Sequence, residues 1–344
     1  MRVLIIKTSS LGDVFHALPA LSDARDAIPG LRVDWVVEEA FAEIPTWHPA
    51  VDKVIPVAWR RWRRNLGSAA TWREMAAFRR RLRGQRYDLI LDAQGLIKSA
   101  VIARLAKGTR CGLDRSSARE PLASRAYQQR ISVAKGEHAI FRLRKLFAAC
   151  LGYALPDSPI HYGIDSGRWP APALARPYVV FLHGSTWDTK LWPEEYWMEL
   201  CGIAAAAGDA VLLPWGNTEE RLRAERIAAH HDHAHVLDKL SLSDMAGLLA
   251  YAKAVIGVDT GLSHVAAALD VPTVALYGAT DAKLTGVLGP KVRLLSADFR
   301  CAPCLSKQCL IAREAQAVYP PCYASLDPQT VWAAAVHAPG ETPR

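Results

Sequence analysis

The segment from residue 254 to 269 places the strongest constraint on what this chain can fold into. Residues 254–258 are a short apolar run, the polar turn Asp259-Thr260-Gly261 follows, and an apolar helical stretch covers 262–269. The run has the length and composition of a buried strand, and glycine lets the backbone approach a ligand closely. The helix directs free amide groups and its positive dipole end at the turn. The segment predicts a strand–turn–helix unit, whose turn is either a diphosphate site or an ordinary turn capped by Asp259 or Thr260.

The same alternation of strand-like and helical segments runs along the chain. In the first half we expect strands at 3–7, 32–37, 53–57 and 87–92, and helical segments at 14–28, 71–83 and 95–107. In the second half we expect strands at 178–182, 210–214, 254–258 and 273–277, and helices at 219–230, 243–252, 262–269 and 327–337. This order is typical of an α/β fold with doubly wound parallel sheets.

The length of 344 residues suits two domains. Residues 152–177 carry five prolines and little periodic pattern, which is typical of a connection between domains. We expect a Rossmann-like N-terminal domain at 1–165, a linker at 166–177, a Rossmann-like C-terminal domain at 178–325, and a helix within 326–344 that packs back on the first domain. Because ligands bind at the carboxyl ends of parallel strands, two domains that face a central cleft would hold two ligands opposite each other.

Charge and hydropathy limit the possible partners. No apolar run approaches the ~20 residues that span a bilayer, and Lys7 interrupts the short apolar start, so a cytoplasmic chain without a signal peptide is expected. The formal net charge is +8, and the stretch from Lys53 to Arg86 holds eleven Lys or Arg residues against one acidic residue, Glu74. Such a cluster attracts nucleic acid, phosphorylated small molecules or an anionic membrane surface.

The seven cysteines fall into two groups. The first group is expected to be separate buried thiols: Cys111, Cys150 and Cys201. The second group lies close together near the end: Cys301, Cys304, Cys309 and Cys322. Its C-x-x-C spacing resembles metal ligands, but no second such pair follows, so reduced loop thiols are favoured over a structural metal or a disulfide. A histidine tract at 230–235 is interpreted as a surface loop. No metal site is expected.

Asp13 is the candidate catalytic residue of the first half. Residues 8–13 form a polar, glycine-containing loop after the first strand, without the spacing of a dinucleotide fingerprint or a P-loop. Because Asp13 stands where a helix begins, it either caps the helix or removes a proton from a bound hydroxyl. The helix dipole keeps the pKa of such a carboxyl low, so a base here depends on positioning.

Polar turns after strands of the second half describe a nucleotide-diphosphate site. The first turn carries Lys190, whose ammonium could neutralise a leaving phosphate, or which is a solvated surface lysine. The next carries Glu219 and Glu220, either of which could accept hydrogen bonds from ribose or act as a helix-dipole partner. The chain has no Asp-x-Asp triplet of the kind with which sugar transferases hold a metal over a diphosphate. A metal-free reaction is therefore expected.

The basic residues of the first half allow two interpretations. The run 60–64 alternates arginines with a tryptophan, and Lys98 and Arg119 add to it. The group is either a nucleic-acid surface or a site for a phosphorylated or carboxylated acceptor, which arginine binds through two parallel hydrogen bonds. The run 79–81 is interpreted as a solvated helix face.

Over almost its whole length the chain resembles the lipopolysaccharide heptosyltransferases of inverting glycosyltransferase family 9. The resemblance rests on residues 7–13, 34–39, 92–99, 118–124 and 258–264. The first and last stretches are shared across the family, and the middle three are closer to the branch that adds the first heptose than to the branch that adds the second. The resemblance implies the glycosyltransferase B fold. It also implies transfer of L-glycero-D-manno-heptose from ADP-heptose to the first Kdo of Kdo2-lipid A, with inversion and without a cofactor.

The resemblance also implies roles for individual residues. Asp13 would be the base, and Lys190 would stabilise the departing diphosphate. The expected donor-binding residues are Ser185, Thr186, Lys190, Glu220, Asp259, Thr260, Gly261 and His264. The expected acceptor-binding residues are Ser10, Gly12, Arg60, Arg61, Arg63, Arg64, Lys98 and Arg119. Because the acceptor is a lipid, peripheral contact with the anionic cytoplasmic face of the inner membrane is expected. A nucleic-acid partner is not expected.

Other functions are weighed beside this one. A second transferase of the family, such as the enzyme that adds the second heptose, would use a different acceptor. A nucleotide-sugar epimerase of the same fold would need no acceptor. A binding module built on the basic cluster would bind nucleic acid or membrane in a salt-dependent way, without affinity for an ADP-sugar.

Overall fold

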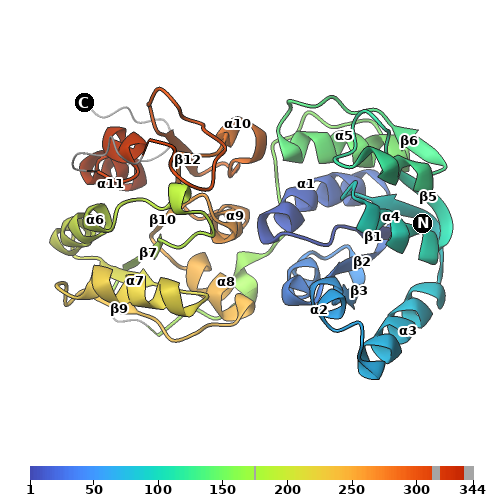
Figure 1. Cartoon of the computed structure of the whole chain (residues 1–344), viewed down its shortest axis with the longest axis horizontal. Coiled ribbons are helices and arrows are strands. Elements are labelled where there is room, and N and C mark those ends of the chain that lie inside the picture. The colour runs from blue at the N-terminus through green and yellow to red at the C-terminus, as the bar shows by residue number, and fades with distance from the viewer. Residues whose placement is uncertain (174–175, 312–317, 337–344) are drawn as a thin grey trace. The chain divides into compact units, whose positions relative to one another are not determined.

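The computed structural model describes residues 1–173, 176–311 and 318–336. The chain divides into two compact units, Met1–Ile164 and Asp165–Arg344. Each unit is built on a six-stranded sheet with helices packed on its faces (Figure 1). Every strand pairing is parallel. Among the described residues, no helix combines the length and the apolar character that a membrane span requires.

The sheet of the first unit has the order β3-β2-β1-β4-β5-β6. Its strands are β1 (Arg2–Ile6), β2 (Arg32–Glu38), β3 (Val51–Val57), β4 (Arg86–Asp92), β5 (Lys107–Leu113) and β6 (Gln129–Ile131). Its helices are α1 (Leu11–Ala27), α2 (Trp59–Arg64), α3 (Ala69–Arg83), α4 (Ile97–Leu105) and α5 (Ala139–Leu151). The central strands β1 and β4 each contain a buried apolar run, at 3–6 and 89–91, and the sequence predicts both strands to within one residue at each end.

Two strands, β5 and β6, and two helices, α2 and α5, were not expected in this unit. β5 contains two glycines and three charged or polar residues, and β6 is a three-residue strand at the sheet edge. Neither has the apolar run of a buried strand. The helix expected at 95–107 is shorter, because α4 ends at Leu105 where the chain turns into β5. α5 was not predicted either, and it packs against α1 and β5.

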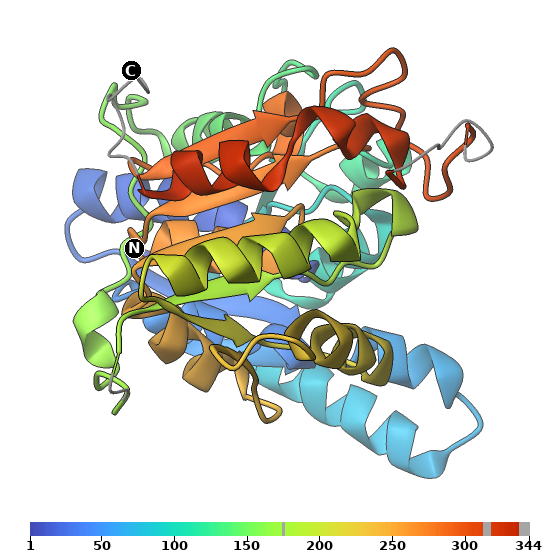
Figure 2. The same cartoon turned by 90° about the vertical axis from the view of Figure 1, so that its left-hand side faces the viewer.

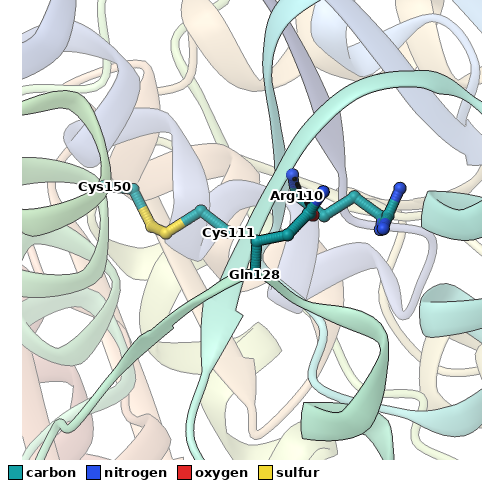
Figure 3. The surroundings of a disulfide bond; sticks show 4 residues. All are labelled: Arg110, Cys111, Gln128 and Cys150. Carbon is teal, nitrogen blue, oxygen red and sulfur yellow. Dashed lines mark hydrogen bonds between the residues drawn. A yellow bond between two sulfur atoms is a disulfide. The ribbon is translucent and has the colours of Figure 1, made fainter.

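The prediction of separate buried thiols at Cys111 and Cys150 is wrong. The two residues form a disulfide with a Cα–Cα distance of 6.0 Å (Figure 3). Cys111 lies in β5 and Cys150 in α5, and the bridge joins positions 39 residues apart. Such a pair gives no spacing signal, because the packing of α5 on β5 brings the two residues together. Cys201 is a buried free thiol, as expected.

The sheet of the second unit has the order β12-β11-β10-β7-β8-β9. Its strands are β7 (Tyr178–Leu182), β8 (Ala210–Leu213), β9 (Ala234–Val236), β10 (Ala254–Val258), β11 (Thr273–Tyr277) and β12 (Val292–Ser296). Its helices are α6 (Glu194–Ala206), α7 (Thr218–Ala228), α8 (Leu242–Ala250), α9 (Gly261–Ala268), α10 (Ala282–Thr285) and α11 (Pro328–Val336). The core includes Phe181, Trp192 and Trp197. The Trp197 ring lies tilted against Phe181 at a centroid distance of 5.2 Å and edge-to-face with Trp192 at 4.9 Å.

The C-terminal helix packs differently from the expectation. Within the described residues, α11 contacts α6 and the strands β10, β11 and β12 of its own unit, and it lies beside α6 in Figure 2. The buried Val331 belongs to this contact, and Trp192 Nε1–H donates to the carbonyl of Leu326 over 3.0 Å. An apolar helix face thus covers the sheet of the second unit, where packing on the first domain was predicted. Residues 337–344 of the expected segment lie outside the described residues.

Candidate active site

Sheet order gathers the predicted loops within each unit. In the first unit β1 and β4 are neighbours, so the loops that follow them, at residues 7–10 and 93–96, meet at one sheet edge. In the second unit the adjacent strands are β11, β10, β7 and β8. The turns after these four strands therefore lie together at the carboxyl edge of that sheet, where open α/β sheets bind ligands.

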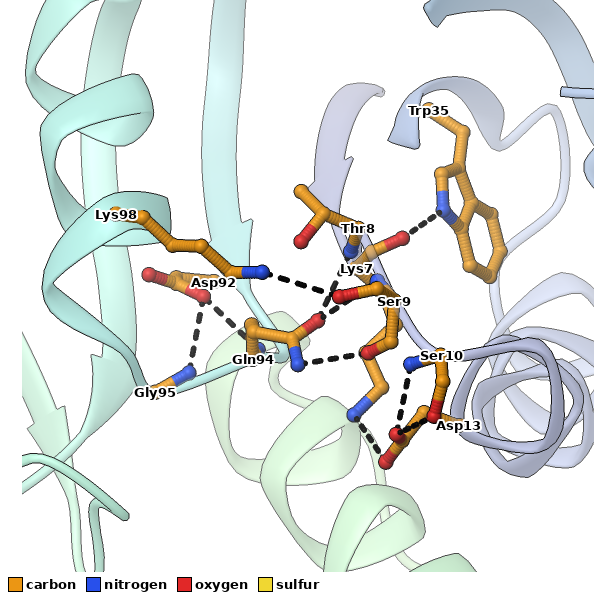
Figure 4. A network of polar contacts seen from close by, with 10 residues as sticks. All are labelled: Lys7, Thr8, Ser9, Ser10, Asp13, Trp35, Asp92, Gln94, Gly95 and Lys98. Atoms are coloured by element: carbon orange, nitrogen blue, oxygen red, sulfur yellow. Dashed lines mark hydrogen bonds and ion pairs between the residues drawn. The ribbon is translucent and has the colours of Figure 1, made fainter. Parts of the chain in front are cut away.

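Asp13 lies in the first turn of α1, three residues after the N-cap Ser10. Its Oδ2 accepts hydrogen bonds from the backbone N–H of Ser10 over 2.8 Å and from the Ser10 hydroxyl over 2.9 Å. Its Oδ1 lies 3.5 Å from Nζ of Lys7, whose side chain is only 8% exposed (Figure 4). The simpler interpretation, in which Asp13 is the N-cap, is therefore wrong in position: Ser10 is the N-cap, and the side chain of Asp13 accepts from it. The Asp13 side chain is nevertheless 36% exposed, so an incoming hydroxyl can reach the carboxylate.

The charge state of Asp13 follows from these neighbours. Burial raises the pKa of the carboxyl, but the Lys7 charge, the Ser10 hydrogen bonds and His16 outweigh it and bring the pKa down to about 2. The group is an ionised carboxylate at neutral pH. It can accept a proton, but its low basicity makes position more important than strength.

Gln94 fixes the loop before Asp13, and sequence reasoning missed it. Its Oε1 accepts from the backbone N–H groups of Thr8 and Ser9 over 2.9 and 3.3 Å, and its Nε2 donates to the Ser9 carbonyl over 2.8 Å (Figure 4). The backbone N–H of Gln94 donates to the buried Asp92 over 2.9 Å. The contacts of Gln94 with Thr8 and Ser9 join residues that are 86 and 85 positions apart in the chain. No local pattern in the sequence could have indicated them.

Lys98, which was expected to bind the acceptor, lies at the same loop. Its Nζ donates to the Ser9 hydroxyl over 3.0 Å. Burial lowers the pKa of Lys98, Glu38 raises it, Arg60 lowers it and Asp13 raises it. These mutual effects place Lys98 within electrostatic range of Asp13 and Arg60. The structure thus groups the expected base with two of the expected acceptor-binding cations.

The other acceptor candidates are less closely grouped. The exposed guanidinium of Arg61 already forms two ion pairs within the protein, with Glu39 at 3.0 Å and with Glu74 at 2.8 Å. An acceptor anion would have to compete with both carboxylates for Arg61. The remaining arginine candidates are exposed side chains: Arg60, Arg63, Arg64 and Arg119. Ser10 and Gly12 belong to the start of α1 beside Asp13.

In the second unit Lys190 is paired with Asp259. Nζ of Lys190 lies 2.7 Å from Oδ2 of Asp259, and the two side chains are 16% and 13% exposed. Nζ also lies 4.7 Å from the ring centroid of Trp187. The hydroxyl of Thr280 donates to the same Asp259 oxygen over 2.6 Å, and the Ser185 hydroxyl donates to the Asp259 carbonyl over 3.3 Å. The structure brings the predicted cation and three hydroxyl or carboxylate groups together.

Thr280 was not predicted. It follows β11 in a turn that begins with Gly278, so a glycine-containing turn at a strand end was its available signal.

The start of α9 has the expected form. Thr260 is the N-cap, and its side chain makes no capping hydrogen bond. Gly261 is the first helical residue, and His264 is buried one turn later. The N–H of Ser263 donates to the Thr260 carbonyl over 3.2 Å, and the N–H groups of Gly261 and Leu262 before it are left for a ligand or for solvent. The predicted diphosphate turn keeps the feature on which that prediction depends.

Glu220, and not Glu219, contacts the neighbouring turns. Glu219 is exposed, whereas Glu220 is half-buried. Its Oε2 accepts from the backbone N–H of Gly216 over 2.7 Å, and its own N–H donates to the Asn217 side chain over 3.0 Å. A Cβ on Gly184 would lie 2.8 Å from the Glu220 carboxyl carbon, so the absent side chain makes room for this carboxylate. Glu220 thus lies between the turns after β7 and β8.

The cysteine-containing loop packs against the same region. Four free thiols line one small cavity: Cys301, Cys304, Cys309 and Cys322. Thr189 belongs to the lining, and its hydroxyl donates to the Ser306 carbonyl over 2.5 Å. Among the described residues, no group of three or more His, Cys, Asp or Glu side chains is arranged to hold a metal ion. The loop therefore supports the turn that carries Lys190 through packing and hydrogen bonds.

Comparisons with known proteins match both halves of the chain. The model of glycosyltransferase family 9 (heptosyltransferase) matches residues 75–314. The chain is 53% identical over 340 residues to lipopolysaccharide heptosyltransferase 1 of Pseudomonas aeruginosa, with 96% of each protein covered. It is similar to the structure of E. coli heptosyltransferase WaaC with ADP, at a TM-score of 0.84 and 50% identity, over 87% of this chain and 94% of that one. The same coverage and identity hold for WaaC with ADP-2-deoxy-2-fluoro heptose, at a TM-score of 0.81.

These matches agree with the architecture. Two doubly wound parallel α/β units were expected from the sequence, and the strand orders and the WaaC likeness confirm the glycosyltransferase B class. The family match covers well over half of the residues, and the relatives align along most of the chain. The chain belongs to glycosyltransferase family 9, the heptosyltransferases, and is an enzyme of that family.

Proposed function

We propose that this enzyme transfers L-glycero-D-manno-heptose from ADP-heptose to the first Kdo of Kdo2-lipid A, with inversion at the anomeric carbon. The observation that carries the proposal is the ionised, solvent-accessible carboxylate of Asp13, held by Ser10 and Lys7 at the sheet edge. The donor is inferred from WaaC, whose structures contain ADP and ADP-2-deoxy-2-fluoro heptose and to which the chain is 50% identical.

In the proposed reaction Asp13 is the general base. The acceptor hydroxyl donates a hydrogen bond to the carboxylate, and its oxygen attacks the anomeric carbon from the face opposite ADP. The proton moves to Asp13 as the new C–O bond forms, because the hydroxyl becomes acidic only at that stage. A base whose pKa is about 2 can act in this concerted way. One displacement of this kind inverts the configuration.

Lys190 and the first turn of α9 serve the leaving group. As the glycosidic C–O bond breaks, negative charge grows on the diphosphate, and a positioned ammonium stabilises it. Lys190 is held by Asp259 and Trp187 on the side of the turn after β10. The amide groups at the N-terminus of α9 supply further hydrogen-bond donors. We propose that Glu220 accepts from the ribose hydroxyls.

Lys98, Arg60 and their neighbours would bind the acceptor. The Kdo carboxylate is a planar anion that guanidinium groups bind well. Lys98 lies at the Asp13 loop through its contact with Ser9, so it would hold the acceptor close to the base. Because the acceptor is a lipid, we propose a peripheral enzyme at the cytoplasmic face of the inner membrane.

An acceptor-panel assay tests the function. The enzyme is incubated with ADP-heptose and either Kdo2-lipid A, its monoheptosylated product, or no acceptor, and the products are identified by mass spectrometry. Addition of one heptose to Kdo2-lipid A alone is the expected result, and a chelator should leave the rate unchanged. Transfer to the heptosylated product alone would assign the enzyme to the second step. Isomerised sugar without an acceptor would contradict transfer altogether.

A further inference from the structure

The α2–α3 hairpin carries most of the basic cluster and lies at one edge of the first unit (Figure 1). Its exposed arginines are Arg60, Arg61, Arg63, Arg64, Arg73, Arg79, Arg80, Arg81 and Arg83. Glu74 is the acidic residue of this stretch, and its carboxylate is already paired with Arg61 at 2.8 Å. Apart from Arg61, which pairs with Glu39 and Glu74, these arginines give the hairpin a surface of strongly positive charge.

One stripe of α3 combines this charge with an aromatic ring. The helix packs inward through Thr71, Phe78 and Leu82, which are buried. Positions 72, 76, 79 and 83 are all exposed, and their spacing of four, three and four residues aligns them along one side of the helix. That stripe begins with Trp72 and ends with two arginines. The apolar face of α3 packs into the core, so this outward stripe offers one aromatic ring at one end and guanidinium groups at the other.

The tip of the hairpin is apolar. Trp72 is 57% exposed and Leu66 is 50% exposed. The indole N–H of Trp72 donates to the Leu66 carbonyl over 2.8 Å, so its polar group is satisfied within the tip. The apolar surfaces of the Trp72 ring and of Leu66 are exposed on the outside of the tip. Exposed large apolar side chains beside arginines are typical of proteins that touch the lipid headgroup region.

The other end of the stripe has a hollow lined by cations. Arg79, Arg80 and Arg83 surround it together with Ala76 and Gly84. Guanidinium groups around a concave surface fit phosphate oxygens, which they bind through paired hydrogen bonds. The helix thus carries an apolar anchor near its start and a hollow lined by cations near its end.

We propose that the outer face of α3 docks this enzyme on an anionic lipid bilayer. Leu66 and Trp72 enter the headgroup layer, and Arg79, Arg80 and Arg83 bind lipid phosphates. Nucleic acid would use the charge equally well, but it offers no apolar layer to the tip. A bilayer uses both features, and each basic residue near an anionic membrane adds to binding. The inference extends the proposed function, since it names the surface that brings the enzyme to a lipid acceptor.

Vesicle partitioning of the full chain tests the proposal. Binding to phosphatidylglycerol vesicles and to phosphatidylcholine vesicles is measured by co-sedimentation at two salt concentrations. The wild type should prefer the anionic vesicles. L66S/W72S should bind the anionic vesicles at least about tenfold more weakly, because an apolar anchor is lost. R79Q/R80Q/R83Q should bind about 100-fold more weakly and lose much of its salt dependence.

Matched variants identify non-specific effects. L222S removes another leucine with 50% exposure, and R32Q/R115Q/R125Q removes three exposed arginines of the same unit. Both should bind vesicles like the wild type. Equal partitioning of all variants would overturn the proposal, as would binding to RNA without binding to anionic vesicles.

Transfer to a deacylated, water-soluble Kdo acceptor separates this proposal from the proposed function. The tip and α3 variants should keep that activity within about twofold while they lose vesicle binding. If the wild type itself fails to use the soluble acceptor and Kdo2-lipid A in detergent, the proposed function is wrong, whatever the vesicles show. If transfer is intact and vesicle binding does not depend on α3, the docking surface is wrong.

Discussion

The loops that carry Asp13 and Lys190 follow the first strand of their respective units, β1 and β7, yet they are held in different ways. The Asp13 loop is fixed by three hydrogen bonds from the neutral side chain of Gln94 to backbone groups. Lys190 is held by a charged partner, Asp259, and by the ring of Trp187.

The difference matches the tasks proposed for the two loops. A weak base must already be in place when the acceptor arrives, since position supplies what basicity lacks. A lysine that receives a diphosphate must be able to change partners, and an ion pair allows that exchange. The Asp13 loop is therefore fixed before substrate binds, whereas Lys190 can exchange its partner when substrate binds.

The Asp13 loop can be tested against a structural twin. In α8, Asp244 accepts a hydrogen bond from the N-cap Ser241 over 2.7 Å, as Asp13 accepts from Ser10 over 2.9 Å. Replacement of Asp13 by Asn should lower kcat by about 10²–10⁴, the usual cost of losing a general base. D244N should cost a similar amount of stability and leave kcat unchanged. Steady-state kinetics and thermal melts check this, and near-normal turnover in D13N would remove Asp13 from its proposed role.

Lys190 has its own matched control. Lys253 forms an ion pair of 2.6 Å with Asp209 outside the turns of the donor site. K190M should lower kcat by about 10²–10³, because the leaving diphosphate loses its cation, and should weaken ADP binding measured by calorimetry. K253M should change neither quantity. If both variants behave alike, the Lys190 pair is structural.

A Gln94 variant tests whether the Asp13 loop contributes to the reaction by holding Asp13 in position. Q94L removes three hydrogen bonds to the loop and should lower kcat by about 10–10², since small displacements at a reacting centre are costly. KM for ADP-heptose should stay unchanged. Gln128 makes a comparable bond to the N–H of Arg110 over 2.9 Å, so Q128L is the comparison. A loss of stability without a loss of kcat would show that the clamp serves folding alone.

Lys7 sets the pKa of the base. Its charge helps lower the pKa of Asp13 to about 2, so K7M should raise that pKa toward the ordinary value of 3.8. Transfer needs the ionised carboxylate, and the acidic limb of the kcat/KM profile should therefore move to higher pH. K7R keeps the charge and should keep the limb in place. An unmoved limb in K7M would mean that another group controls the profile.

The disulfide should matter least for activity. C111S/C150S removes a bridge between β5 and α5, and a bridge of this kind contributes about 2–4 kcal/mol to the free energy of unfolding. The double variant should melt at a lower temperature with an unchanged kcat, because neither residue touches the Asp13 loop. The free Cys201 in the second unit provides a control, C201S, which should remain active. A large loss of kcat in C111S/C150S would tie the catalytic loop to that bridge.

A structural feature can be predicted from the sequence when it depends on residues that are close together in the chain. The buried strands β7, β10 and β11 have the residue ranges predicted, because a strand covered on both faces is a continuous apolar run. The edge strands β6 and β9 have three residues each, too few for a pattern. Asp13 and Lys190 could be proposed because turns after strands are readable from spacing.

The partners of these residues could not be predicted. Gln94 reaches its loop across more than 80 positions, Thr280 reaches Asp259 across 21, and the bridged cysteines are 39 apart. The Gln94 and Thr280 contacts depend on which strands are neighbours in the sheet, and the disulfide depends on the packing of α5 against β5. A sequence read alone, even one that resembles a known family, does not provide that information.

The Lys190–Asp259 pair also has a consequence for the end of the catalytic cycle. A nucleotide that has lost its sugar carries more negative charge than the donor did, and a pocket built from cations alone would retain it. Here a carboxylate stands 2.7 Å from the ammonium and can recapture it as soon as the phosphates loosen. Under the proposed mechanism this carboxylate competes with the phosphates for Lys190, and the competition would assist product release.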